Sequence, residues 1–232
     1  MPNVNRSDVI NLLARSQLFP ELDRASLETV FEAAAVRGAA PDAVLFRQGD
    51  PPSQLFVLTN GQVKVAQVNH GGAPLTIRFM EPGDVIGCVA VFRGVCYPAT
   101  AIAIAPSTAL AWPSSRIAEL MEQFPQIGKN ALNLVGSRAQ EMLHRLREMA
   151  IEPVNARVAA AFLRLCRQAG RMEGKDTVLA VSRQDIAEMA GTNLYSVSRA
   201  LSRWDEQGIL EARRQLIKVR DKDRLRRLSA KQ

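Results

Sequence analysis

Hydrophobic residues recur at helical spacing at the start of the chain. Over residues 7–36, two groups of apolar positions are separated by Pro20, and Ser7 can cap the first group. Because apolar residues three or four apart share one face of a helix, we expect short amphipathic helices here. Their apolar positions are Val9, Ile10, Leu12, Leu13, Leu27, Val30, Phe31 and Ala34.

Between residues 43 and 112 the apolar positions instead alternate with their neighbours. This period of two residues is typical of strands. Turn sequences rich in Gly, Pro, Asn and Asp separate the alternating segments. We therefore expect a β roll of many short strands, with helices covering its open end. The alternating positions are Val44, Phe46, Phe56, Leu58, Val63, Val65, Leu75, Ile77, Phe79, Ile102 and Ile104.

The longest helical pattern runs from Pro125 to Met149. Its apolar or small positions follow in alternating steps of four and three residues, which is a heptad seam. The helix could pack only on its own β domain. We favour a symmetric dimer through this helix, because the alternation of four-residue and three-residue steps is not interrupted. The dimer seam comprises Gly128, Leu132, Val135, Ala139, Met142, Leu146 and Met149.

Residues 181–208 carry the most specific local pattern. Ser182 and Asp185 have the spacing of a short capping box, and Asn193 is a suitable N-cap for a following helix. Gly191 lies in the turn between the two segments, and Gly208 ends the second one. Two short helices joined by a turn that contains glycine form a helix-turn-helix.

The second of these helices is expected to enter the major groove of DNA. Val197, Leu201 and Trp204 share its apolar face. Arg199 lies opposite, and its planar guanidinium can donate to both O6 and N7 of guanine. We expect bases to be read by Tyr195, Ser198 and Arg199. The residues expected to contact the DNA backbone are Ser182, Arg183, Thr192, Ser196, Arg203, Arg213 and Arg214.

The charge distribution separates the two halves of the chain. Lys and Arg total 30 and Asp and Glu total 23, which gives a net charge of +7. Residues 1–150 hold 13 basic and 13 acidic residues, whereas residues 151–232 hold 17 and 10 and so carry the whole excess. Double-stranded DNA is the polyanion that we expect the second part to bind.

Pro153 interrupts the long helical pattern, because proline removes an internal hydrogen bond. After Gly208, residues 209–219 are expected to form two strands around a basic turn, which is the wing. We therefore predict an α+β chain with three parts. These are a sensor β-roll domain over residues 1–124, a dimerisation helix over 125–150 and a winged helix-turn-helix DNA-binding domain over 151–232.

Several classes of protein are not expected. No apolar run approaches the ~20 residues of a membrane helix. The first residues lack a signal-peptide pattern, so we expect a cytoplasmic protein without membrane contact. The cysteines Cys88, Cys96 and Cys166 are too few and odd in number for a disulfide framework. Motifs for nucleophilic catalysis, phosphate or dinucleotide binding and metal ligation are missing, so we expect neither an enzyme nor a metal site.

Segments spread over nearly the whole chain together resemble the Crp/Fnr family of bacterial transcription regulators. The resemblance implies a cyclic-nucleotide-binding-like β roll, a long dimer helix and a C-terminal winged helix. It implies a homodimer on a palindromic operator with half-sites about one helical turn apart. RNA polymerase is a further expected partner, because a transcription activator must touch it. The matching segments are Ser16–Phe19, Leu45–Asp50, Leu55–Leu58, Gly61–Val65, Pro82–Gly87, Ser182–Ala187 and Val197–Arg199.

The departures from the family concern the effector. Members that bind cyclic AMP carry a glutamate where this chain has Cys88, and an Arg-Ser pair where it has Tyr97 and Pro98. Burying a phosphate without a cation or several donors is costly, so we do not expect cyclic AMP to be the effector. The resemblance places the effector pocket at Gly87, Cys88, Val89, Tyr97 and Pro98.

Residues 97–101 and 195–199 look most like the branch of the family that responds to nitrogen oxides. That branch implies half-sites resembling TTG, with Arg199 on the guanine. The alternatives are a heme sensor, a thiol switch at Cys88 and Cys96, a roll without ligand, a cyclic-nucleotide-responsive regulator, and, from another class, an enzyme with an undetected site. The candidate heme ligands are His70, Cys88, Cys96 and His144.

Overall fold

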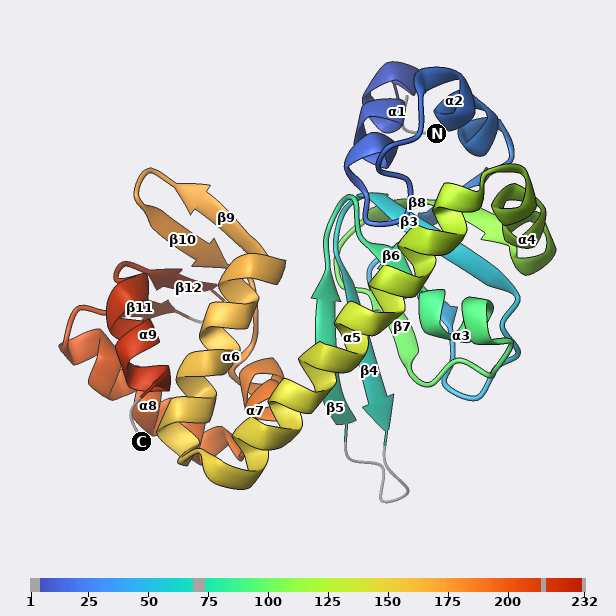
Figure 1. Cartoon of the computed structure of the whole chain (residues 1–232). Helices are drawn as coiled ribbons and strands as arrows, with labels where there is room; N and C mark the ends of the chain where they lie inside the picture. Colours follow the sequence, from blue (N-terminus) through green and yellow to red (C-terminus); the bar gives the residue numbers. More distant parts are fainter. Residues whose placement is uncertain (1–4, 69–73, 214–215, 231–232) are drawn as a thin grey trace. The chain divides into compact units, whose positions relative to one another are not determined.

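The computed structural model describes residues 5–68, 74–213 and 216–230. By their contacts, the residues form two compact units, one made of Met1–Gln67 with Met80–Glu141 and the other of Val68–Phe79 with Met142–Gln232. Figure 1 labels the helices and strands. The units divide within the long helix, whereas we expected boundaries after residues 124 and 150. The three-part division stays a prediction.

Two four-stranded sheets form the roll, as the alternating pattern predicted (Figure 1). The first has the order β1-β8-β3-β6, and the second has the order β2-β7-β4-β5. The strands of the first are β1 (Ala35–Ala39), β8 (Ser107–Pro113), β3 (Gln54–Asn60) and β6 (Val85–Ile86). The strands of the second are β2 (Val44–Phe46), β7 (Thr100–Ala103), β4 (Val63–Val68) and β5 (Pro74–Met80).

Both faces of β3 are buried. Leu55 and Val57 belong to a cluster shared with helices, and Phe56 and Leu58 belong to a second cluster that fills the roll. Trp112 on β8 is fully buried, and its indole Nε1–H donates to the Val30 carbonyl at 2.8 Å. The helices that contribute to the first cluster are α1 (Arg6–Arg15), α2 (Arg24–Glu32), α3 (Cys88–Arg93), α4 (Ser114–Gln123) and α5 (Pro125–Ile151).

Four details of the predicted pattern in this unit were wrong. The first helix is capped by Asn5, whose side-chain oxygen accepts from the Ser7 N–H, and not by Ser7. The helical spacing does not continue to residue 36, because α2 ends at Glu32 and β1 begins at Ala35. A helix, α3 (Cys88–Arg93), lies inside the region expected to be all strand, between two glycines in the left-handed conformation. Ile104 lies beyond the end of β7.

The second unit contains the helix-turn-helix. Its sheet has the order β11-β12-β10-β9, and Phe162 packs edge-on against Trp204 with ring centroids 5.9 Å apart. The proline break is confirmed, since Pro153 is the N-cap of α6. The further elements are α6 (Val154–Gln168), β9 (Gly170–Glu173), β10 (Asp176–Leu179), α7 (Arg183–Ala190), α8 (Leu194–Glu206), β11 (Leu210–Arg213), β12 (Leu216–Val219) and α9 (Lys222–Ser229).

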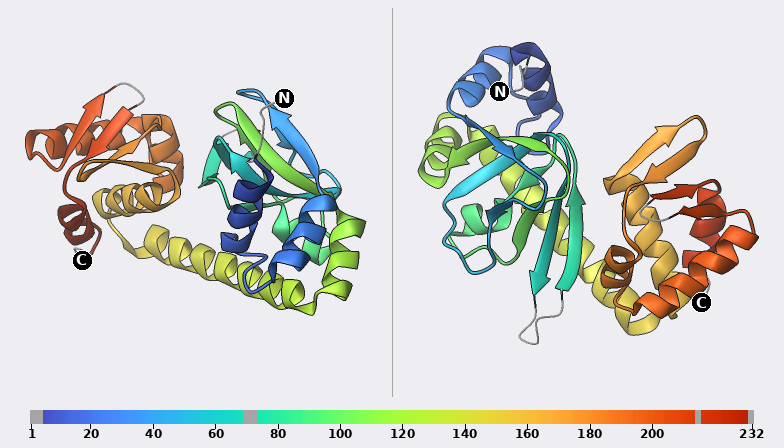
Figure 2. Two further views of the ribbon diagram at one scale, coloured as in Figure 1. Left: turned by 90° about the horizontal axis from the view of Figure 1, so that it is seen from above. Right: turned by 180° about the vertical axis from the view of Figure 1, so that it is seen from behind.

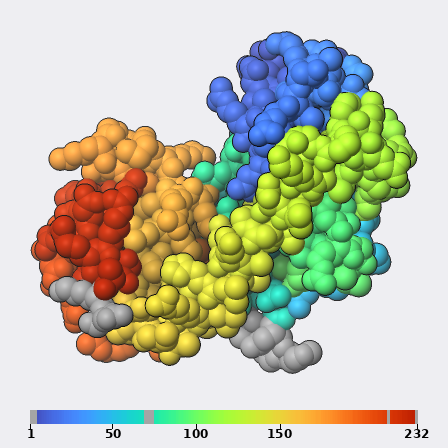
Figure 3. All heavy atoms as spheres, viewed as in Figure 1, coloured from blue at the N-terminus to red at the C-terminus, as the bar shows by residue number. Residues whose placement is uncertain are grey.

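Helix α5 is continuous from Pro125 to Ile151, as Figure 2 shows. Its atoms lie uncovered along the face seen in Figure 3. The residues that it buries are Ile127, Asn130, Ala131 and Leu134. Those buried residues and the predicted dimer seam occupy different positions on the helix. Among the helices of the described residues, none is long and apolar enough to cross a membrane.

The cysteines differ in their surroundings. Cys88 is 5% exposed at the start of α3, Cys96 is exposed, and Cys166 is half-buried in α6. Burial raises the pKa of the Cys88 thiol, although the nearby Arg138 acts in the opposite direction. Burial also raises the pKa of the Cys166 thiol to about 11. Because the thiolate is the reactive form, Cys88 and Cys166 should be inert near neutral pH.

We therefore expect iodoacetamide to alkylate Cys96 well before Cys88 and Cys166 at about pH 8, below the usual thiol pKa of about 8.5. Mass spectrometry of peptides from timed aliquots measures the three rates. A parallel reaction in guanidinium chloride is the control, in which all three thiols should react alike. Labelling of Cys88 as fast as Cys96 in the folded protein would contradict the burial argument and favour a thiol switch.

Candidate nucleic-acid interface and sensor region

Local hydrogen bonds define the start of α7 and the turn that follows it. The Ser182 hydroxyl accepts from the Asp185 N–H, and the Asp185 carboxylate accepts from the Ser182 N–H, so the predicted capping box is present. Gly191 ends α7 at φ 59°. A Cβ added there would lie 2.8 Å from Met149 Cε, so backbone conformation and packing both favour glycine.

The apolar face of α8 determines which residues the helix presents to solvent. Asn193 caps the helix, because its side-chain oxygen accepts from the Ser196 N–H at 2.8 Å. Val197, Leu201 and Trp204 are all buried, as the pattern predicted. Gly208, at φ 68°, directly follows the C-cap. The helix is therefore held by its cap and its apolar face, and its opposite face is open.

The predicted base-reading residues lie together on that open face. Tyr195 is 70% exposed, and Arg199 is also exposed, with its guanidinium carbon 5.7 Å from the centroid of the Tyr195 ring. A cation over an aromatic face is attracted to it. Ser198 is half-buried and accepts from Arg183 Nη1 at 3.4 Å. Tyr195 thus gives the Arg199 fork a defined position on the helix surface.

The residues expected at the DNA backbone are distributed over three elements. Arg183 and Arg203 are exposed, Thr192 and Ser196 are half-buried, and Ser182 is engaged in its capping box. Arg213, at the end of β11, donates to Glu211 at 2.7 Å, and its side chain remains 74% exposed. Arg214 lies outside the described residues.

Glu211 balances part of the positive charge of the wing. It accepts from Arg213 and Arg220, and the hydrogen bond from Arg213 is the main reason that its pKa is lowered. A low pKa keeps this carboxylate ionised near neutral pH. The charge of Arg213 is therefore partly compensated before any DNA is bound.

A buried carboxylate on α7 is a feature that the sequence reasoning missed. Glu188 is 8% exposed and accepts from Thr76 Oγ1 at 2.5 Å and from Gln184 Nε2 at 3.1 Å. Arg145 of α5 donates to the carbonyls of Ile77 and Met189. The partner Thr76 lies 112 positions away in the sequence, so local spacing carried no signal for this contact.

The predicted effector pocket is largely filled by the chain's own side chains. Tyr97 is 1% exposed and stacks on Phe46, with ring centroids 3.8 Å apart. Its hydroxyl donates to the Gln54 carbonyl at 2.5 Å and accepts from the Gln54 N–H at 2.9 Å. Gly87 has φ 85°, and a Cβ there would lie 3.1 Å from the Tyr97 ring.

The other predicted effector residues do not complete a phosphate site. Cys88 is buried, Val89 is half-buried and Pro98 is exposed. None of these side chains carries a positive charge. The Tyr97 hydroxyl already donates one hydrogen bond and accepts another within the chain. These five residues therefore supply no cation for a buried phosphate, and the positive charge near Cys88 belongs to Arg138 of α5, which pairs with Glu141 at 3.6 Å.

The candidate heme ligands that the structure describes differ in their surroundings. His144 has a 72% exposed side chain and lies 3.3 Å from Glu148, and Cys88 is a buried thiol with a raised pKa. Cys96 is exposed, and His70 lies outside the described residues. Within the described part of the chain, no group of three or more His, Cys, Asp and Glu could hold a metal ion.

Comparisons with known proteins agree with this arrangement. Residues 36–124 match the cyclic nucleotide-binding domain family, and residues 156–228 match the Crp-like helix-turn-helix domain family. The "Cyclic AMP receptor protein" of Thermus thermophilus is 27% identical over 177 residues, covering 76% of this chain and 80% of the relative. The "Anaerobic regulatory protein" of Pasteurella multocida is 28% identical over 183 residues, covering 77% and 66%.

A solved structure shows the same fold. That of FixK2 from Bradyrhizobium japonicum has a TM-score of 0.76 at 23% identity, and the match covers 86% of this chain and 98% of that one. The β roll, long helix and helix-turn-helix described above therefore occur together in a known protein. With the sensor-type domain and the Crp-like helix-turn-helix both matched, the chain belongs to the Crp/Fnr family of DNA-binding transcription regulators.

Proposed function

We propose that this transcription regulator is a homodimer that reads a palindromic operator through α8 and responds to an effector other than cyclic AMP. The observation that carries the proposal is the exposed face of α8, where Arg199 lies over Tyr195. A helix whose opposite face is buried can insert this face into the major groove. Arg199 can then donate to guanine O6 and N7.

The other contacts separate into base reading and phosphate binding. Tyr195 and Ser198 flank Arg199 on α8 and complete the proposed base-reading set. Phosphate contacts set the register and carry little sequence information. The proposed phosphate-contacting residues are Ser182, Arg183, Thr192, Ser196, Arg203, Arg213 and Arg214.

Replacing the arginine that we propose reads guanine tests the base-reading role. We expect Arg199→Ala to cost about 1–3 kcal/mol of binding free energy on the operator and far less on random DNA. The operator is first selected from a random duplex pool, and fluorescence anisotropy at fixed salt measures both affinities. Arg203→Ala is the matched control, and it should lower the affinity for both duplexes equally. Equal losses on both duplexes for Arg199→Ala would leave that residue only a phosphate role.

The exposed side of α5 supports the proposed dimer. Leu132, Met142, Leu146 and Met149 are 73%, 51%, 64% and 48% exposed in the single chain. Val135 is half-buried and Ala139 is exposed at the seam positions between them. Large apolar side chains repeated along one helix face are typical of an interface with another protein surface. A second copy of the same helix satisfies the heptad spacing.

Charges introduced into this seam should prevent dimerisation. We expect Leu132→Asp combined with Leu146→Asp to give a folded monomer that no longer binds the operator, because both positions are exposed in the single chain. Light scattering measures the mass, and circular dichroism checks the fold. Asn133→Asp combined with Gln140→Asp adds the same charge at exposed positions beside the seam and should remain dimeric. A seam variant that stays dimeric would remove this interface from the proposal.

The filled sensor region supports an effector other than cyclic AMP. By the resemblance, family members that bind cyclic AMP carry an arginine at the position of Tyr97 and a glutamate at the position of Cys88. The response to nitrogen oxides stays a prediction from the resemblance. Contact with RNA polymerase and a cytoplasmic location also stay predictions. The described positions give the heme alternative no support.

Titration with cyclic AMP tests this part of the proposal. We expect no binding heat and no change in operator affinity, because none of the five predicted effector residues offers the phosphate a positive charge. Isothermal calorimetry measures the binding, and anisotropy measures the operator affinity. The Thermus thermophilus relative named above serves as the positive control. Tight binding that raises operator affinity would show that cyclic AMP is the effector after all.

A further inference from the structure

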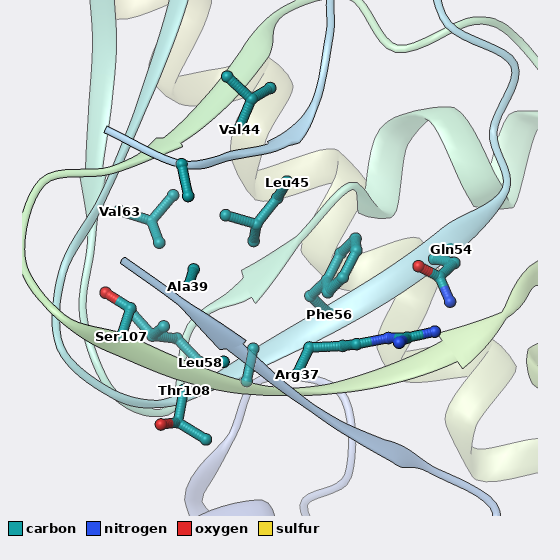
Figure 4. A pocket seen from close by; sticks show the side chains of 13 residues that line it. Arg37, Ala39, Val44, Leu45, Gln54, Phe56, Leu58, Val63, Ser107 and Thr108 are labelled. Atoms are coloured by element: carbon teal, nitrogen blue, oxygen red, sulfur yellow. The ribbon is translucent and has the colours of Figure 1, made fainter. Parts of the chain in front are cut away.

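The roll contains a pocket that lies apart from the predicted effector residues. It opens between β1 and β2, which are edge strands of the two sheets. Its volume is about 230 Å³, and residues of both sheets line it (Figure 4). Gly87, Cys88, Val89, Tyr97 and Pro98 are not among its lining residues.

Most of the lining is apolar. Leu45, Phe56, Leu58 and Val63 form its interior surface, and alanines from β1 and β8 contribute the smaller positions. Phe56, Leu58 and Val63 are buried members of the cluster that fills the roll. Val44, on the outer edge, is 36% exposed. An apolar ligand would therefore continue the core of the roll outward to the rim.

One end of the pocket is polar and carries one charge. Figure 4 shows the Arg37 and Gln54 side chains directed toward one another at this end, with Ser107 and Thr108 at the other. Arg37 is the only charged residue of the lining, which contains no carboxylate. Within the described part of the chain, no hydrogen bond or ion pair holds the Arg37 guanidinium. Its fork matches the geometry of a carboxylate.

We propose that this pocket binds a small apolar carboxylate, with the acid group on Arg37 and the hydrocarbon part on Leu45, Phe56 and Leu58. The volume is below the range of about 300–1,000 Å³ for drug-sized ligands, so the ligand is a small molecule such as a short fatty acid. The inference deepens the proposed function, on which it rests, by naming a ligand class for the sensor unit of the regulator.

The position of the pocket also connects it with the filled sensor region. Gln54 lines the pocket, and its backbone N–H and carbonyl are both hydrogen-bonded to the Tyr97 hydroxyl. Leu45, which precedes the stacked Phe46, lines it too. A bound carboxylate would therefore contact the residues that flank the Tyr97 anchor.

Octanoate and 1-octanol are suitable probes, because they share a chain and differ in charge. Calorimetry on the full-length protein without DNA should show octanoate binding at one site per chain, and octanol binding about tenfold or more weaker. Arg37→Ala should weaken octanoate binding by a similar factor, since Arg37 is exposed and its loss leaves the fold intact. Arg15→Ala, which removes an exposed arginine from α1, is the matched control and should bind normally.

Ala39→Leu provides an independent test, because it fills the pocket at a half-exposed position. We expect it to abolish octanoate binding, with thermal unfolding used to confirm the fold of each variant. Absence of octanoate binding, equal affinity for octanol, or binding unaffected by both Arg37→Ala and Ala39→Leu would each overturn the proposal. Operator affinity measured without octanoate separates these outcomes from a failure of the proposed DNA-binding role.

Discussion

The burial of one face of α8 is the constraint on which DNA recognition depends. Trp204 is 2% exposed and packs edge-on against Phe162 of α6, while Leu201 and Val197 bury the same side of the helix one and two turns earlier. A helix held this way cannot rotate about its axis without exposing a large aromatic side chain. The face that carries Arg199 therefore has a fixed direction, which is the preorganisation that its proposed base-reading role needs.

Aromatic packing also fixes the interior of the sensor unit, where Tyr97 stacks on Phe46. The space between the two sheets of a roll must be filled, because empty apolar cavities lose packing contacts. Tyr97 fills that space by stacking on Phe46, and both backbone groups of Gln54 satisfy its hydroxyl. The same strand, β3, then presents the Gln54 side chain to the pocket at the sheet edges. The filled region around Tyr97 and the pocket at the sheet edges thus share the residue Gln54.

The parts of the structure that were predictable from sequence are those fixed by local interactions. The capping box at Ser182, the Asn193 cap and the apolar stripe of α8 each involve residues within one or two turns of helix. The wing strands and the proline break before α6 followed from similarly local patterns. Edge strand β1 did not, because its residues are mostly exposed and show no alternation. Helix α9 was missed because it is rich in arginine and buries a single residue, Leu225.

Features that depend on distant residues could not be read from spacing. Glu188 is buried because Thr76 lies beside it, and the carboxylate pocket exists because β1 and β2 end two different sheets. Helix α5 shows how far local information extends. Its heptad spacing indicated a seam, but only the structure shows that Ile127, Ala131 and Leu134 bury a separate face of the same helix. Because one face is already committed to the core of its own chain, the exposed leucines and methionines remain available for a second copy. Packing on its own domain and forming a dimer are therefore compatible roles for α5, although the sequence had presented them as alternatives.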